Sequence, residues 1–226
     1  MDDQPGTGGD QSAQSRRLRA LFLRSAALCA DLIAAPGVAA AWQDPSVLPD
    51  LTTGALAGHL SRGILQVEWF LDAGTPAGAA PITAADYYTP PPDASRNSAV
   101  RDRGRERAEA GPTAIADEVR DCLERLARRL PGEPPDRLLE ARGSSGIRGR
   151  VLLLDEYLKV RLVEQVIHGD DLARSVPGTD AEADPAACRI AIGTLVAAAT
   201  RRHGQMAVLH ALARREADTV QALRVL

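Results

Sequence analysis

The sequence is almost devoid of lysine, has few aromatic side chains and contains no long uncharged apolar run. Lys159 is the only lysine among 27 basic residues, and aromatic residues make up 3% of the 226-residue chain. The formal net charge is -3, and acidic and basic residues are interspersed. No continuous positive surface of the kind that a phosphate backbone needs is therefore expected. We expect no nucleic-acid partner.

Features of membrane-spanning or exported proteins are also missing. A membrane-spanning helix needs a run of about 18 apolar residues, and the sequence contains none. The N-terminal segment MDDQPGTGGDQSAQS is polar and acidic, whereas a secretory signal is basic and then apolar. The cysteines lie far apart in apolar helical contexts without CxxC spacing, which favours free thiols in a reducing compartment. We therefore expect a cytoplasmic protein with no membrane contact.

The composition favours one helical domain. With 45% hydrophobic residues, the chain is long enough for one full-sized core. Residues 1–13 lack large apolar side chains, which predicts a disordered tail and a single domain over residues 14–226. No segment shows convincing period-two alternation, which excludes a substantial sheet. The expected fold class is all-α, with an antiparallel bundle of about four helices at its core.

Apolar periodicity, capping residues and proline stops predict a series of helices. In chain order they are 16–35, 52–74, 95–110, 112–130, 151–176, 185–203 and 205–217, the last two within a C-terminal extension over 183–226. The prolines between residues 75 and 94 indicate a long ordered loop with one turn of helix. The connection over residues 131–150 is expected to be rich in turns.

One predicted helix, over residues 151–176, carries a polar stripe along a single face. Its members are spaced by four, three, four and three residues: Tyr157, Arg161, Glu164, His168 and Asp171. Apolar residues cover most of the remaining circumference, so the stripe is expected to be internal. A buried carboxylate beside an imidazole is costly unless both are paired, and a divalent cation pairs with both. Glu164 and His168 are thus a candidate metal half-site, and a hydrogen-bonded core pair is the alternative.

His59 is the candidate third ligand. It lies on the apolar face of the helix predicted from residue 52, with Leu56, Gly63 and Val67 one or two turns away. Two histidines and one glutamate leave coordination positions open, which is typical of a catalytic metal site rather than a closed structural one. A satisfied core histidine is the alternative interpretation.

Arg161 and Asp171 are candidate catalytic residues on either side of the Glu164–His168 pair. Asp171 is placed to orient an imidazole, and Arg161 is placed to pair with an anion. An internal salt bridge is the alternative for both residues. The remaining histidines, His203 and His210, lie at a helix end and near the C-terminus, so they are interpreted as structural or surface residues.

Two segments resemble the hallmark motifs of a known family. LTTGALAGHLSRG and RLVEQVIHGDDLA resemble those of the mycothiol-dependent maleylpyruvate isomerase N-terminal family, in the DinB-like superfamily of metal-binding helical bundles. The resemblance covers about residues 16–176. It implies a DinB-like antiparallel four-helix bundle with additional C-terminal helices. It also implies that one divalent metal, zinc first, with nickel, iron or manganese as alternatives, binds to His59, Glu164 and His168.

The resemblance further implies a thiol-dependent reaction, in which a small thiol such as mycothiol binds at the metal as thiolate and attacks an electrophile. Our first hypothesis is a metal-dependent thiol S-transferase or thiol-assisted isomerase, with a small thiol and an electrophilic metabolite as partners. The second is a non-catalytic metal-binding module that acts as a stress-linked sensor or an interaction protein. A third, a bundle that has lost its metal, is disfavoured because all three ligands are present. A homodimer is left open.

Overall fold

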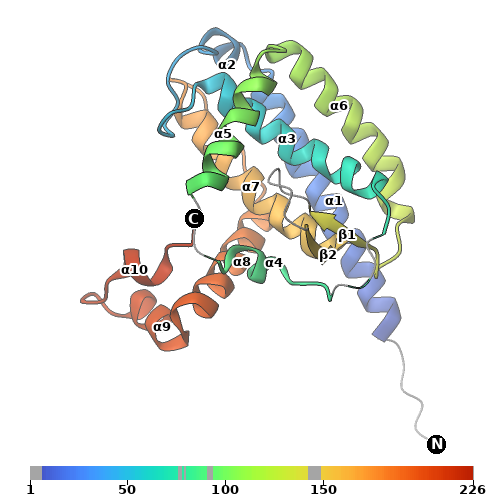
Figure 1. The fold of residues 1–226 in the computed structure, drawn as a ribbon, viewed down its shortest axis with the longest axis vertical. Coiled ribbons are helices and arrows are strands. Elements are labelled where there is room, and N and C mark those ends of the chain that lie inside the picture. The colour runs from blue at the N-terminus through green and yellow to red at the C-terminus, as the bar shows by residue number, and fades with distance from the viewer. Residues whose placement is uncertain (1–6, 76–77, 79, 91–93, 142–148, 226) are drawn as a thin grey trace, which may run out of the picture.

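The computed structural model describes residues 7–75, 78, 80–90, 94–141 and 149–225. Figure 1 shows a helical molecule with one small sheet. The helices of the bundle are α1 (Thr7–Ile33), α3 (Thr53–Asp72), α6 (Pro112–Arg129) and α7 (Leu154–Arg174). The other elements are α2 (Pro36–Ala40), α4 (Ala84–Tyr88), α5 (Ala94–Ala108), η1 (Leu130–Gly132), β1 (Leu138–Ala141), β2 (Arg150–Leu153), α8 (Pro185–His203), α9 (Gln205–Ala213) and α10 (Thr219–Leu223).

The four bundle helices enclose the hydrophobic core. Helices α1 and α3 each pack against both α6 and α7. On facing helices, His59 lies beside Glu164 and Phe70 lies beside Tyr157, so α3 and α7 run in opposite directions. The largest fully buried side chains come from all four helices and from the sheet: Phe22, Ile33, Leu56, Ile64, Leu65, Leu71, Ile115, Leu126, Leu130, Leu139, Leu152 and Tyr157. The all-α bundle predicted from the sequence is confirmed.

Helices α3 and α6 are neighbours that run in the same direction. Arg125 of α6 pairs with Glu68 of α3, and one turn further along both helices Arg129 pairs with Asp72. Parallel neighbours need a long connection between them, and the chain supplies one that contains α4 and α5. Two of the four bundle helices therefore run in each direction, but helices that follow one another in the chain do not always reverse direction.

The hairpin of β1 and β2 corrects one expected boundary. The sequence predicts turns over residues 131–150 and a helix from residue 151, but Arg150–Leu153 forms a strand paired antiparallel with β1. Leu139 and Leu152 are register partners, and both are fully buried. Strand pairing across the hairpin buries these leucines, a long-range gain that overrides the local helical periodicity. The turn residues 142–148 lie outside the described residues.

Helix α1 begins within the segment that the sequence analysis expects as a tail, residues 1–13. Residues 1–6 lie outside the described residues, and α1 begins at Thr7. Ser15 is buried and donates a hydrogen bond to Asp155 of α7, which fixes the helix near this point. Adding turns to an existing helix needs no new nucleus, so the polar segment before Ser15 continues it.

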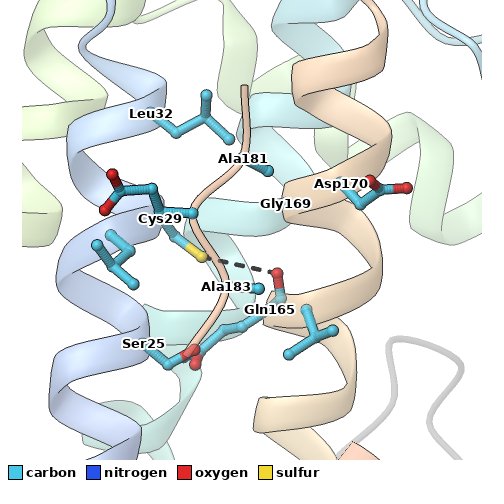
Figure 2. Close-up of a pocket in the computed structure, with 11 residues that line it drawn as sticks. Ser25, Cys29, Leu32, Gln165, Gly169, Asp170, Ala181 and Ala183 are labelled. Atoms are coloured by element: carbon cyan, nitrogen blue, oxygen red, sulfur yellow. Dashed lines mark hydrogen bonds between the residues drawn. The ribbon is translucent and has the colours of Figure 1, made fainter. Parts of the chain in front are cut away.

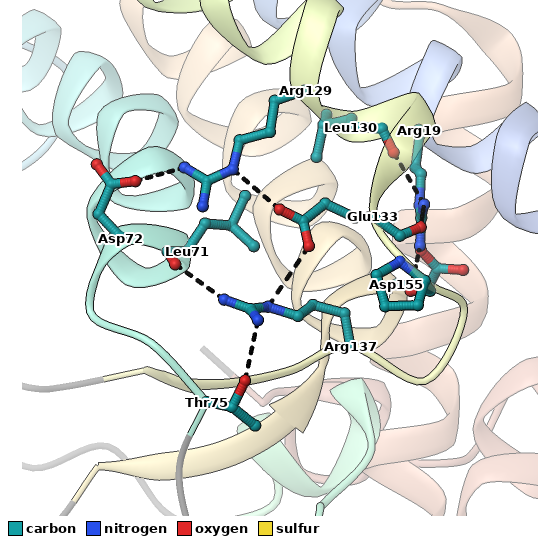
Figure 3. Close-up of polar contacts among 10 residues, drawn as sticks. Arg19, Leu71, Asp72, Thr75, Arg129, Leu130, Glu133, Arg137 and Asp155 are labelled. Carbon is teal, nitrogen blue, oxygen red and sulfur yellow. Dashed lines mark hydrogen bonds and ion pairs between the residues drawn. The ribbon is translucent and has the colours of Figure 1, made fainter.

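A buried arginine joins α1 to the end of α6 and the start of α7. The Arg19 guanidinium lies 3.0 Å from a carboxylate oxygen of Asp155, and it donates a hydrogen bond of 2.9 Å to the carbonyl of Leu130 (Figure 3). In the same region, Arg137 donates to the carbonyl of Leu71, at the end of α3. These contacts satisfy carbonyls at helix ends, which would otherwise lack partners.

The C-terminal helices form an extension on one side of the bundle (Figure 1). Helix α8 packs against α7 and α4, and α9 and α10 pack against α8. The helix expected over residues 205–217 ends earlier, at Ala213, and the short α10 follows it. Among the described residues, no helix combines the length and apolar character that crossing a membrane requires.

Candidate metal centre

Helix α3 places His59 in the second turn of the helix, facing α7. The helix begins where predicted, because the Thr52 hydroxyl accepts a hydrogen bond of 3.1 Å from the backbone N–H of Ala55. Helix α5 crosses α3 at the level of His59, and each helix contributes one glycine to the contact. A Cβ added at Gly58 would lie 2.5 Å from the Gly104 carbonyl oxygen, and one added at Gly104 would lie 2.6 Å from the Ala55 carbonyl oxygen. This close crossing sets the position of α5 beside His59.

The three predicted ligands come together between α3 and α7. The Nε2 atoms of His59 and His168 lie 3.6 and 3.5 Å from the same oxygen, Oε2 of Glu164. One ligand atom from each of the three residues lies within 4.8 Å of the others. Two ligands held about 2.1 Å from a tetrahedral zinc ion lie about 3.4 Å apart, so these separations fit a divalent cation. The three side chains are 20–22% exposed, which leaves one side of the cluster open to solvent.

Asp171 orients one of the imidazoles. Its Oδ2 lies 3.1 Å from Nδ1 of His168, one turn along α7. A proton on Nδ1 is held by this contact, so Nε2, which faces Glu164, is the nitrogen that would give up its proton to bind a metal. The candidate role of Asp171 in the sequence analysis matches this placement.

Tyr88 of α4 holds the glutamate ligand. Its hydroxyl lies 2.7 Å from Oε1 of Glu164 and 3.1 Å from the Val160 carbonyl oxygen. Burial raises the pKa of Tyr88 well above its usual value, and the Glu164 charge adds to this effect, so the hydroxyl stays protonated and donates. With Oε1 engaged, Oε2 is the glutamate oxygen that faces both imidazoles.

Residues of α8 and α7 hold α4 in this position. The Arg202 guanidinium of α8 donates hydrogen bonds to the carbonyls of Tyr88, Thr89 and Pro90 at the end of α4. At the other end, a carboxylate oxygen of Glu156 accepts a hydrogen bond of 2.7 Å from the backbone N–H of Ala84. The C-terminal extension therefore helps to position a side chain that contacts a candidate metal ligand.

The electrostatics of the cluster favour a proton on His168. Burial lowers the pKa of His59. Burial also opposes the charged forms of Glu164 and His168, but their hydrogen bonds outweigh it. The pKa of Glu164 is held well below its usual range by His168 and His59, and that of His168 is raised to about 9 by Asp171 and Glu164. A bound cation would take the place of the proton on His168.

Arg161 lies beside the cluster without contacting its ligand atoms. Its Nη1 donates to the side-chain oxygen of Gln66 on α3 at 3.3 Å, and its guanidinium carbon lies 4.9 Å from the Tyr157 ring centroid. Within the described residues Arg161 makes no salt bridge, whereas Asp171 contacts His168 and lies 4.0 Å from the guanidinium of Arg174. An internal salt bridge, the alternative for both residues, is therefore seen for Asp171 but not for Arg161.

The other histidines and the cysteines lie away from the cluster. The His203 ring lies 3.2 Å from the Arg224 carbonyl, and His210 is exposed on α9. All three cysteines are free, and Cys29 faces a small pocket between α1 and α7, where its thiol contacts the Gln165 carbonyl at 3.7 Å (Figure 2). Burial raises the pKa of Cys29 to about 12, and that of Cys122 also to about 12. Neither thiol is a nucleophile at neutral pH.

The cluster lies in a part of the chain that matches a known protein family. The model of the mycothiol maleylpyruvate isomerase N-terminal domain matches residues 22–173, which is more than half of the chain. The chain belongs to this family. All three candidate ligands lie inside the matched region, whereas Arg202 and the C-terminal helices lie outside it. No curated protein and no solved structure matches the chain.

Tyr88 is the contact that sequence reasoning missed. The segment around it gave a signal, because a cluster of prolines and two tyrosines predicted an ordered loop with one helical turn. Thr83 does cap that turn, with hydrogen bonds to Asp86 in both directions. The local sequence predicts the turn, but its contact with Glu164 depends on Arg202 and Glu156, which lie far away along the chain.

Proposed function

We propose that the chain is a metal-dependent enzyme that joins a small thiol, such as mycothiol, to an electrophilic metabolite, as an S-transferase or a thiol-assisted isomerase. The observation that carries this proposal is the convergence of His59, Glu164 and His168 on one point that remains open to solvent. A divalent cation with an open position supplies Lewis acidity, which lowers the pKa of a thiol and favours its nucleophilic form.

The residues of the chain prepare the site for such a reaction. Asp171 holds the proton on Nδ1 of His168, and Tyr88 donates to Oε1 of Glu164, so both ligands present their free atoms in a fixed direction. The partly exposed side of the cluster is where the reactants would reach the ion. The thiol comes from solution, because the buried thiols of Cys29 and Cys122 have raised pKa values and Cys188 lies on α8, a helix that supplies none of the ligands.

Mass spectrometry of reaction mixtures tests the proposal. The zinc-loaded protein is incubated with mycothiol and a panel of electrophiles, and the initial rate of adduct formation or isomerisation is compared with that of the metal-free protein. We expect zinc-dependent turnover that is lost in Glu164→Ala and retained in His210→Ala, a matched substitution at an exposed position. A protein that holds zinc but does not accelerate any of these reactions would instead support the non-catalytic metal-binding module.

A further inference from the structure

A buried cation without a carboxylate partner lies one helical turn from the metal cluster. Arg161 is 6% exposed, and its Nε is enclosed without any hydrogen-bond partner. Its one hydrogen bond goes to the neutral side chain of Gln66, and within the described residues no carboxylate pairs with it. A buried charge normally has an ionic partner, because the cost of its desolvation is otherwise uncompensated.

Two further enclosed donors without partners lie in the same region. The Tyr157 hydroxyl is buried and unpaired, on the ring over which the Arg161 guanidinium lies. Burial raises the pKa of Tyr157, so the hydroxyl keeps its proton and can donate. The Nε of Arg62, on the facing helix α3, is likewise enclosed and unpaired, and Arg62 makes no salt bridge within the described part of the chain.

Arg161 lies close to the surface, beside a glycine of the facing helix. Gly63 of α3 faces Arg161, and a Cβ placed there would lie 3.6 Å from Nη1. The lack of a side chain at Gly63 therefore leaves room for about one methyl group beside the guanidinium. Gly63, Gln66 and Glu164 around it are all partly exposed, so Arg161 lies just below the surface beside the open side of the metal cluster.

We propose that Arg161, Tyr157 and Arg62 form an anion subsite that binds a carboxylate group of a reactant at the metal centre. A planar guanidinium and a hydroxyl match the two oxygens of a carboxylate. The ligand supplies a carboxylate in direct contact with Arg161, whereas the charge of Glu164 acts on it only from a greater distance. This inference rests on the proposed function, because it assigns a recognition group to the thiol or to the electrophile of that reaction.

Calorimetric titration of the zinc-loaded protein with unreactive ligand pairs tests the subsite without turnover. The electrophile arm compares 3-succinimidopropionate with N-ethylsuccinimide, and the thiol arm compares N-acetylcysteine with its amide. Each pair differs by one carboxylate. We expect at least a tenfold preference for the carboxylate form in one arm, which identifies the reactant that carries the group.

Two substitutions in the subsite and one matched control decide the assignment. Arg161→Met should reduce the preference to less than twofold while zinc content stays unchanged. It should also keep or raise the melting temperature, because an apolar side chain relieves the unpaired buried charge. Tyr157→Phe removes only an unpaired hydroxyl and should reduce the preference several-fold without loss of stability. Arg128→Met, at an exposed position on α6, should change neither.

The subsite is refuted if neither arm shows a carboxylate preference in the wild-type protein, or if the preference survives in Arg161→Met. Should that variant not fold, an unchanged preference in Tyr157→Phe refutes the subsite in its place. A clear carboxylate preference without any zinc-dependent turnover would leave the subsite standing and would contradict the proposed reaction alone.

Discussion

Zinc should bind more tightly as the pH rises from about 7 to about 9, because the metal competes with a proton on His168. The pKa of His168 is raised to about 9 in the metal-free protein. The pKa of His59 is lowered and Glu164 is ionised, so neither of them has a proton to lose in this range. At pH 7, about two units below the pKa, protonated His168 outnumbers neutral His168 about 100 to 1. The apparent affinity should therefore be about 100-fold below its plateau value.

Competition with a chromophoric chelator of known proton affinity measures this dependence. We expect the affinity to rise about tenfold per pH unit and to level off above about pH 9. Calorimetry in two buffers of different ionisation enthalpy should show about one proton released per zinc near pH 7.5. The control variant His210→Ala, exposed on α9, should give the same profile. A flat profile between pH 7 and 9 would show that Asp171 and Glu164 do not hold a proton on His168, and would refute the reasoning.

Three further predictions follow from single contacts. Tyr88→Phe should weaken zinc binding about tenfold in the chelator assay, because Glu164 loses the hydrogen bond that orients it; unchanged affinity would contradict this. Gly104→Ala should lower the free energy of unfolding by about 2 kcal/mol in urea titrations, since its Cβ meets a backbone oxygen at 2.6 Å, whereas Gly193→Ala on α8 has no neighbour within 4 Å and should cost nothing. Equal costs would refute the close crossing. Zinc-dependent turnover should survive in a folded variant in which Ala or Ser replaces Cys29, Cys122 and Cys188, and its loss would indicate a protein thiol.

The parts of the fold that depend on local signals could be predicted from the sequence. Helix α3 starts after Thr52, α6 starts at Pro112 and α8 runs from Pro185 to His203, as predicted. Caps and prolines act within one or two turns, so a single sequence contains the information. The hairpin was not predicted, because four-residue strands carry little periodicity and the pairing of Leu139 with Leu152 spans residues that are distant in sequence.

The same distinction holds for the candidate site. The spacing of Glu164 and His168 on one face follows from helical geometry alone, and the apolar surroundings of His59 indicated that it faces the core. Whether α3 and α7 meet at the level of these residues is a property of the whole bundle, and the structure brings their ligand atoms within 4.8 Å. Tyr88 is placed by Arg202 of α8, a contact that no local pattern predicts.

The most direct test of the central claim is the metal content of the purified protein and its ligand variants, measured by elemental analysis after loading with zinc and removal of the excess. We predict about one zinc per wild-type chain and a similar amount in His210→Ala. Most of the metal should be lost from each of His59→Ala, Glu164→Ala and His168→Ala, with the helical circular dichroism retained. Wild-type zinc content in all three variants would contradict the account and place the metal elsewhere.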